Sequence, residues 1–200
     1  MPFNLNQFLA NGLVWGGARP SKFDVQLTLP PELSGIDTNF AGTNTSKFTF
    51  SCKAASIPSF QVGVVPIPYF GRKIKSAGDR TWDDWRITVM LDEDYVTRAA
   101  FEAWNNAINN IESNVMTASM DGESYKADWT VTHYSKDGNP IAVYTVHNGW
   151  PRALGPIQLD WDGTDRISQF EVDVAFDNFY PTGSGVTFAG TTSTDYTPDL

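Results

Sequence analysis

Two histidines, His133 and His147, are the residues best suited to general acid–base or metal chemistry. Because Asp137-Gly138 is a favoured sequence for a two-residue hairpin turn, the flanking strands should pair with His147 opposite Asp128. His133 would then lie roughly 17 Å along the strand from Asp128 and on the other face of the sheet. The two imidazoles therefore cannot share a metal ion, and we expect each at a surface or an interface.

Neighbouring carboxylates could serve a glycosidase, which needs two carboxyl groups that face each other across a cleft. Asp83 and Asp84 are adjacent on an expected strand, so their side chains point to opposite faces. The acidic run 92–94 precedes an expected helix, where negative charge is favoured, and Asp94 is the candidate N-cap. Both groups are better explained by structure than by catalysis.

The segment DWDGTD at 160–165 resembles half of a calcium-binding loop. The EF-hand pattern also requires a glycine at its sixth position and a ligating glutamate at its twelfth. Gly163 does not occupy the sixth position, and Glu171, which would be the twelfth residue, lies within an expected strand. A turn led by aspartate and glycine is the preferred interpretation.

Motifs for nucleophiles and cofactors are absent from the sequence, which contains no GxSxG, P-loop or CxxC pattern. Cys52 is the single cysteine, so an intrachain disulfide is excluded. It alternates with phenylalanines and is expected to be buried and unreactive. We therefore predict that the protein is not an enzyme and uses neither a metal nor a cofactor.

Alternation of apolar and polar residues predicts the strands that would carry these side chains, at 23–29, 48–54, 85–91, 127–132, 141–147 and 167–176. Proline cannot donate to a sheet, so the stretch with Pro58, Pro66 and Pro68 is expected to be an edge strand or an extended excursion. One amphipathic helix is expected over about 95–111, and its apolar stripe consists of Val96, Ala100, Trp104, Ile108 and Ile111.

These elements predict a mainly β fold, an antiparallel β-sandwich or partly open barrel of roughly six to eight strands with one flanking α-helix. The length of 200 residues suits one domain, which we place at 1–182. The composition shifts to glycine, serine and threonine in 183–200, a tail expected to be flexible or to dock on a neighbour. The segment before Arg19 has the pattern of neither a signal peptide nor a membrane span, so a cytoplasmic product is expected.

Acidic residues outnumber basic residues 23 to 14, which gives a net charge of −9. A surface of that sign repels phosphate groups and anionic lipids. The charge argues against a protein that grips nucleic acid, but not against one that lets nucleic acid pass without binding. Aromatic residues make up 14% of the chain, which indicates a large core or large buried interfaces.

The block GRKIKSAGDRTWDDW at 71–85, which runs into ITVMLDED and the expected helix, closely resembles the tail tube proteins of contractile-tailed bacteriophages. Four further segments agree with this family in the same order: ARPSKF at 18–23, FSCKAASIP at 50–58, GWP at 149–151 and IQLDWDGTDRISQFEVDVAFD at 157–177. Each motif alone is weak, but five in the right order are strong. The loop near 30–46 and the tail after Tyr180 depart from the family pattern.

The resemblance implies a structural virion protein of the phage tail tube type. Six copies would form a ring, and rings would stack into the inner tail tube, with strands lining a channel for DNA ejection. The partners it implies are further copies of the chain, the tail sheath protein, and the baseplate and tail terminator proteins. DNA would pass without specific binding, no membrane would be involved, and the protein would be made in the host cytoplasm.

Two sets of charged residues follow from this expectation. The segment 56–80 is either a solvated loop or a contact between rings or subunits, and the residues assigned to that contact are Arg72, Lys73, Lys75, Asp79 and Arg80. Acidic residues that point outward from strands would line the channel and repel DNA; we assign Asp24, Glu171 and Asp173 to this set.

Three alternatives remain open at the level of sequence. A tube-initiating baseplate protein would be related in fold but longer, and a type VI secretion tube protein resembles the 71–104 block less well. A carbohydrate-binding β-sandwich would use Trp129, Trp150 and Trp161 as sugar platforms and would be a monomer. A tube protein would instead form hexamers or long tubes.

Overall fold

The computed structural model describes residues 17–28, 49, 51–116 and 124–182, and the structural statements below refer to these residues. The expected loop at 30–46 and the tail at 183–200 lie outside them. Nine strands and the helix α3 follow one another along the described chain: β1 (Phe23–Thr28), β2 (Cys52–Ala55), β3 (Phe60–Tyr69), β4 (Arg72–Trp82), β5 (Trp85–Met90), α3 (Val96–Ile108), β6 (Ala127–Tyr134), β7 (Pro140–Leu154), β8 (Gln169–Ala175) and β9 (Asn178–Pro181).

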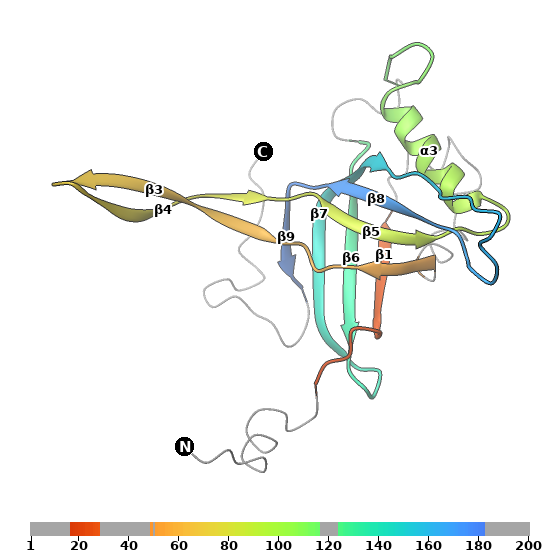
Figure 1. Cartoon of the computed structure of the whole chain (residues 1–200), viewed down its shortest axis with the longest axis horizontal. Coiled ribbons are helices and arrows are strands. Elements are labelled where there is room, and N and C mark those ends of the chain that lie inside the picture. The colour runs from red at the N-terminus through yellow and green to blue at the C-terminus, as the bar shows by residue number, and fades with distance from the viewer. Residues whose placement is uncertain (1–16, 29–48, 50, 117–123, 183–200) are drawn as a thin grey trace.

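Seven strands form one antiparallel sheet system in the order β1-β6-β7-β8-β5-β2, with β9 also paired to β7 (Figure 1). The long strand β7 belongs to both halves of this system. Its first part pairs with β6 and β9, and its last residues pair with β8. We call β1, β6, β9 and the first part of β7 the first sheet, and β2, β5, β8 and the end of β7 the second sheet. The expected antiparallel β-sandwich with one helix is confirmed.

The bend in β7 lies at Asn148 and Gly149, just beyond the expected return strand 141–147, and β7 continues past it to Leu154. Asn148 has a φ of 55°, and the pairing with β6 shifts register at this point. A Cβ on Gly149 would lie 2.7 Å from the ring of Trp129, so only glycine fits against that ring. The irregular backbone lets one strand leave the first sheet and continue in the second.

Aromatic side chains fill the space between the two sheets, whose strands run crosswise in Figure 1. Trp85, Trp104 and Trp129 are at most 1% exposed. The Trp129 ring stacks on those of Trp104 and Phe101, with centroids 6.2 and 6.4 Å away. The indole N–H groups of Trp85 and Trp104 donate to the carbonyls of Ser56 and Tyr125, at 2.6 and 2.9 Å. Much of the aromatic content therefore serves the core.

The helix α3 differs from its predicted bounds at both ends. Tyr95, with a φ of 55°, is the N-cap residue and makes no side-chain cap, so the assignment of this role to Asp94 is wrong. Instead, the carboxylate of Asp92 accepts a hydrogen bond from the backbone N–H of Thr97, at 3.4 Å. The helix ends at Ile108, which leaves Ile111 outside it and 91% exposed. Ala100 and Trp104 of the expected stripe are buried.

The β6–β7 connection is a three-residue loop, 136–138, rather than the expected two-residue turn. Ser135 donates its backbone N–H to the carbonyl of Asn139, at 2.7 Å, and Gly138 has a φ of 84°. The longer loop shifts the pairing of the two strands by one residue. An extra residue in β7 between Pro140 and Ala142 then reverses that shift. From His133 to Trp129 the hairpin therefore keeps the predicted register.

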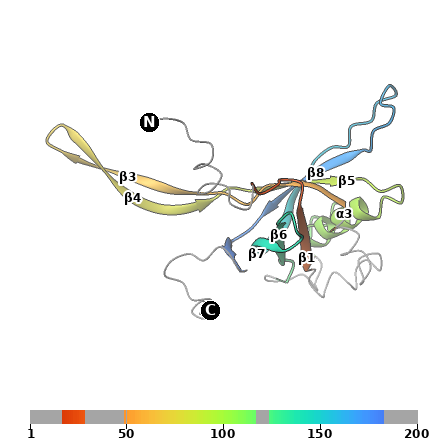
Figure 2. The ribbon, with the colours of Figure 1, turned by 90° about the horizontal axis from the view of Figure 1, so that it is seen from below.

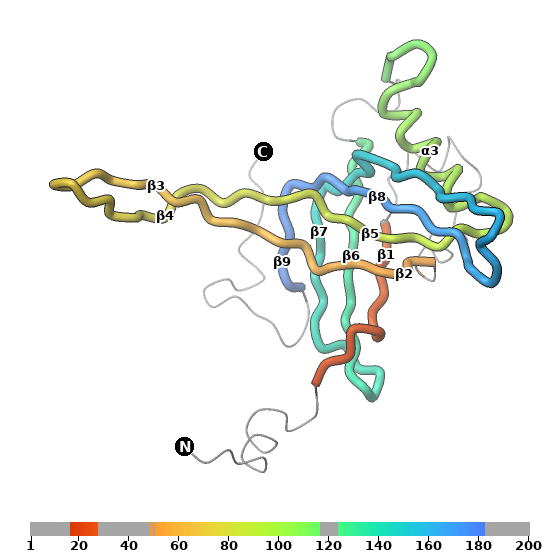
Figure 3. Tube along the Cα trace, viewed as in Figure 1, coloured from red at the N-terminus to blue at the C-terminus, as the bar shows by residue number. Residues whose placement is uncertain are grey.

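Strands β3 and β4 form a separate two-stranded ribbon, which we call the arm, and which projects from the body (Figures 1 and 2). Figure 3 shows that β2 leads into β3 and that β4 leads into β5, so the arm extends the β2–β5 pair of the second sheet. Phe70 and Gly71, both with positive φ, make the turn at its tip. The extended excursion expected from the prolines is confirmed.

Candidate functional site

The base of the arm is fixed to the body by an aromatic cluster. The ring of Trp82 lies 5.8 Å from that of Phe60 and 5.2 Å from that of Phe179 in β9. The guanidinium of Arg80 lies over the Phe60 ring at 4.5 Å from its centroid. Such contacts stabilise the base by cation–π attraction and ring packing, so the arm leaves the body in a defined direction.

The outer part of the arm, residues 63–78, carries apolar side chains that the chain itself leaves exposed. Exposed fractions range from 49% to 91% for Val64, Val65, Ile67, Tyr69, Phe70 and Ile74. An isolated two-stranded ribbon is at best marginally stable in water, and a contiguous exposed apolar patch marks an interaction site. The outer arm is therefore built to be covered by another surface.

The five residues assigned to a contact do not lie together on the arm. Arg72, Lys73 and Lys75 are exposed on its outer part, whereas Asp79 and Arg80 lie nearer the base. Because Arg80 covers Phe60 and Trp82 within the same chain, part of its role is internal.

Glu171 and Asp173 lie on the outer face of the second sheet, and Arg86 on β5 binds both. Its Nε and Nη2 atoms donate to Asp173 at 2.7 and 3.2 Å, and its Nη1 atom lies 3.5 Å from Glu171. The hydrogen bond to Asp173 and the two negative charges raise the pKa of Arg86 above its ordinary value. The two acids are thus neutralised in part by their own strand neighbour.

The same face carries two further polar pairs. Lys53 on β2 donates to the side-chain oxygen of Gln169 at 2.5 Å, and Arg152 on β7 forms an ion pair with Asp84 at 2.8 Å. Positive and negative side chains are interspersed across these four strands. The face is therefore polar and close to charge balance rather than uniformly acidic.

Asp24 lies on β1 in the first sheet, away from the other two predicted acids. Its carboxylate accepts hydrogen bonds from the Tyr134 hydroxyl at 3.0 Å and from the Gln26 amide at 3.2 Å. Burial, followed by the contact with Asp24, raises the pKa of Tyr134. Because the two sheets pack face to face, Asp24 of one copy points in a different direction from Glu171 and Asp173 of that copy.

The histidines occupy separate sites, as the register predicted. His147 Nδ1 lies 3.0 Å from the Asp128 carboxylate, and its Nε2 contacts the Tyr180 hydroxyl on β9. His133 Nε2 contacts the carbonyl of Arg19 at 2.9 Å. Within the described ranges, no three metal-ligating side chains gather into a site for an ion.

The aspartate-rich segment follows the structural interpretation of the sequence, and the cysteine follows it in part, because it is not fully buried. Asp160 accepts hydrogen bonds from the backbone N–H groups of Asp162 and Gly163, at 3.1 and 3.2 Å, so a turn led by aspartate is confirmed. Cys52 is half-buried, and burial raises the pKa of its thiol to about 12. Its thiolate, the reactive form, is scarce at neutral pH.

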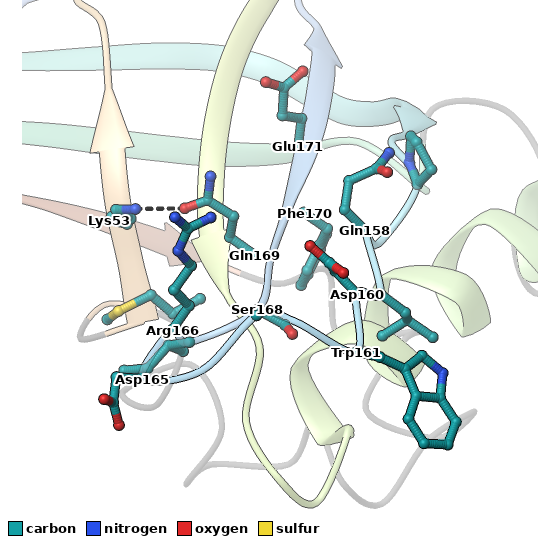
Figure 4. A pocket seen from close by; sticks show the side chains of 15 residues that line it. Lys53, Gln158, Asp160, Trp161, Asp165, Arg166, Ser168, Gln169, Phe170 and Glu171 are labelled. Carbon is teal, nitrogen blue, oxygen red and sulfur yellow. Dashed lines mark hydrogen bonds between the residues drawn. The ribbon is translucent and has the colours of Figure 1, made fainter.

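A groove beneath the β7–β8 loop, residues 155–168, was not foreseen from the sequence. It has a volume of about 1050 Å³ and is lined by residues that include Lys53, Asp160, Asp165 and Arg166 (Figure 4). Trp161 stands at its rim and is fully exposed. In the sequence, the position of Trp161 between two aspartates of a turn indicates an exposed aromatic residue, but this pattern does not predict a groove.

The family model of the phage tail tube protein matches residues 18–182, which includes the arm, both sheets and the loop at 155–168. The chain belongs to the phage tail tube protein family. Over 148 residues it is 37% identical to tail tube protein gp19 of Enterobacteria phages T6 and T4, a match that covers 74% of this chain and 88% of each relative. This tail tube protein is a structural component of the virion of a contractile-tailed bacteriophage, as the sequence motifs implied.

The fold of the tail tube protein also occurs in a chain of the anti-feeding prophage baseplate. That chain has a TM-score of 0.57 and 12% identity, with coverage of 84% of this chain and 96% of the other. The sugar-binding alternative loses two of its three platforms, because Trp129 is completely buried in the core and Trp150 is half-buried, which leaves only Trp161 exposed. In the described ranges, no helix has the length and apolar character needed to span a membrane.

Proposed function

We propose that this tail tube protein assembles into hexameric rings that stack into the inner tube of the tail, with a channel through which DNA is ejected. The observation that carries the proposal is the arm, whose exposed apolar side chains require a covering surface. The number six is supported by the anti-feeding prophage baseplate of similar fold, which is six-fold symmetrised. The tube would contact the tail sheath, baseplate and terminator proteins.

The outer face of the second sheet is the proposed wall of the channel. Arg86 uses its donors on Asp173 and Glu171, so fewer remain to bind a DNA phosphate. Arg152 is engaged in the same way by Asp84, and Lys53 donates to the neutral side chain of Gln169. Such a wall lets a polyanion slide because its arginines are paired with carboxylates and it offers little net attraction. Asp24, on the first sheet, would then lie away from the channel.

The role is structural and without catalysis. The polar side chains that could do chemistry have structural partners instead: His147 binds Asp128 and Tyr180, and Asp160 holds its own turn. Residues 1–182 would form the tube domain, and 183–200 a flexible tail or one that docks on a neighbour. The charged residues of the arm, from Arg72 to Arg80, would take part in contacts between copies.

Electron microscopy of the purified chain in negative stain tests the assembly. We expect six-fold rings and tubes of stacked rings, and the particle mass in solution should correspond to six copies or multiples of six. A chain that stays monomeric at high concentration, with no rings on the grid, would contradict the proposal.

A further inference from the structure

We propose that β9 is a clasp that sets the direction of the arm within one chain, with Phe179 as the positioning residue. The arm leaves the body at the end of the molecule opposite the loop 155–168 (Figures 1 and 2). The described part of the body can therefore orient the arm only through its base, and β9 lies beside that base (Figure 1). The clasp acts inside one copy, and only its effect on tube formation rests on the proposed function.

Phe179 lies where the arm meets the first sheet, and it is 7% exposed. The centroid of its ring is 5.2 Å from that of Trp82 in β4 and 6.1 Å from that of Phe60 in β3. On the side of the body, its ring is 6.2 Å from that of Tyr144 in β7. Rings at these separations pack favourably in tilted or edge-on arrangements. A single side chain of β9 therefore contacts both strands of the arm and the strand that carries β9.

The opposite face of β9 is held by side chains that do not belong to the arm. Because side chains alternate along a strand, Tyr180 points away from Phe179. Its ring stacks on that of His147 with centroids 4.6 Å apart, and its hydroxyl contacts Nε2 of the same histidine. His147 Nδ1 lies 3.0 Å from the carboxylate of Asp128 in β6. The clasp is thus anchored to two strands of the first sheet on one face and holds the arm with the other.

The turn that leads into β9 is tied to the bend of β7. The carboxylate of Asp177 accepts a hydrogen bond from the side-chain amide of Asn148 at 2.9 Å and forms an ion pair with Lys126 at 3.1 Å. Its backbone N–H donates to the carbonyl of His147 at 3.2 Å. These contacts place Phe179 relative to the corner where the two sheets join. The arm, β9 and the bend therefore form one continuous set of contacts.

The length and position of β9 make it the element of this set that can open by itself. It has four residues, Asn178–Pro181, and among the described strands it pairs with β7 alone. A short strand at the edge of a sheet and near a chain end opens at a small part of the global free energy of unfolding. When β9 opens, Phe179 leaves Trp82 and Phe60. Docking of residues 183–200, which directly follow the described chain, would then be transmitted to the arm.

Spin labels measure the direction of the arm in the unassembled chain. Labels on Ser76→Cys in the arm and Ser113→Cys beyond α3, both exposed positions, are placed in a Cys52→Ala background. Double electron–electron resonance then gives the distribution of distances between the labels. In Phe179→Ala this distribution should broaden by about twofold or more, because the arm samples more directions. Phe179→Leu, which keeps most of the apolar bulk, should restore a width close to that of the unaltered residue.

The matched control for this substitution is Phe70→Ala at the tip of the arm. Phe70 is 91% exposed, so the control removes the same ring without a change at the base. Its distribution should keep the original width. Near-ultraviolet circular dichroism of the buried tryptophans verifies that the body of each variant remains folded.

His147→Ala separates the clasp from simple packing at the base of the arm. His147 contacts β9 through Tyr180 and lies on the face of β9 opposite Phe179. Loss of its ring should therefore broaden the distance distribution of the arm through β9 alone. His133→Ala is the matched control, because His133 contacts the carbonyl of Arg19 instead. The same test remains decisive if Phe179→Ala fails to fold.

The outcomes distinguish the clasp from the proposed function. Unchanged distributions in Phe179→Ala and His147→Ala would overturn the clasp, whether or not tubes form. Broadening in Phe179→Ala without broadening in His147→Ala would also overturn it, because the ring would then act without its anchor. If the unaltered chain forms tubes, Phe179→Ala should lower their yield by about tenfold, because an unoriented arm loses entropy on assembly. If the unaltered chain forms neither rings nor tubes, the proposed function fails, and the spin-label distances still decide the clasp.

Discussion

Arg86 and Asp173 face each other across the antiparallel pair β5–β8 and make a two-point ion pair, with N–O distances of 2.7 and 3.2 Å. The same guanidinium lies 3.5 Å from Glu171. The two carboxylates that were expected to repel DNA therefore already bind the positively charged guanidinium of Arg86. On this face, the pairing of charges rather than an excess of acid would prevent DNA from binding.

Removal of these acids should make the wall bind DNA. In the double variant Glu171→Gln/Asp173→Asn, Arg86 loses its partners and can bind a phosphate, so release of DNA from virions should slow. Time-resolved DNA ejection measures the effect, and raised salt should reduce it. Asp24→Asn, on the first sheet, is the matched control. Equal slowing by the control, or unchanged release in the double variant, would argue against the proposed wall.

The contact of His147 with Tyr180 should help to hold β9 on β7. Tyr180→Phe removes one hydrogen bond and should lower the free energy of unfolding by about 0.5–1.5 kcal/mol. Urea unfolding measures the change. Tyr69→Phe, at an exposed position of the arm, removes the same hydroxyl and should be nearly neutral in the unassembled chain. Equal stability of the two variants would show that the contact contributes nothing.

Gly149 should tolerate no side chain. In Gly149→Ala the new Cβ would lie 2.7 Å from the Trp129 ring, which is completely buried and has no room to move. We expect a loss of about 1–3 kcal/mol in the free energy of unfolding. Gly17→Ala is the control, because a Cβ there meets nothing within 4 Å. A thermal melt of both variants checks the prediction, and a neutral Gly149→Ala would show that the bend in β7 is freely adjustable.

Cys52 should make folding less favourable at alkaline pH. Its pKa is about 12 in the folded chain against an ordinary value of 9.0, so the folded state keeps a proton that the unfolded state releases. The stabilisation is complete below pH 9 and is lost as the pH rises toward 12. The difference in unfolding free energy between the native chain and Cys52→Ala, measured across this range, should therefore shrink with pH. A constant difference would contradict the raised pKa.

Local sequence patterns predicted much of the fold. The alternation of Trp85, Ile87 and Val89 defined β5, and the predicted hairpin register, which an extra residue in β7 restores after the longer turn, brings His147 to Asp128. Register follows from the sequence because a shift of one residue would turn every apolar side chain to the wrong face. The helix cap at Asp94 was predicted wrongly, since backbone geometry at Tyr95 decided where the helix begins.

The sequence by itself determined which side chains point outward from each strand, and five ordered motifs determined the family. Only the tertiary structure decided that Asp24 lies on one sheet and Asp173 on the other, that Arg86 binds the second acid, and that the arm and the groove lie at opposite ends. Alternation along a strand distinguishes its two faces, but it carries no information on which sheet the strand joins or where that sheet faces. Those relations depend on pairing between distant segments and on the bend at Gly149.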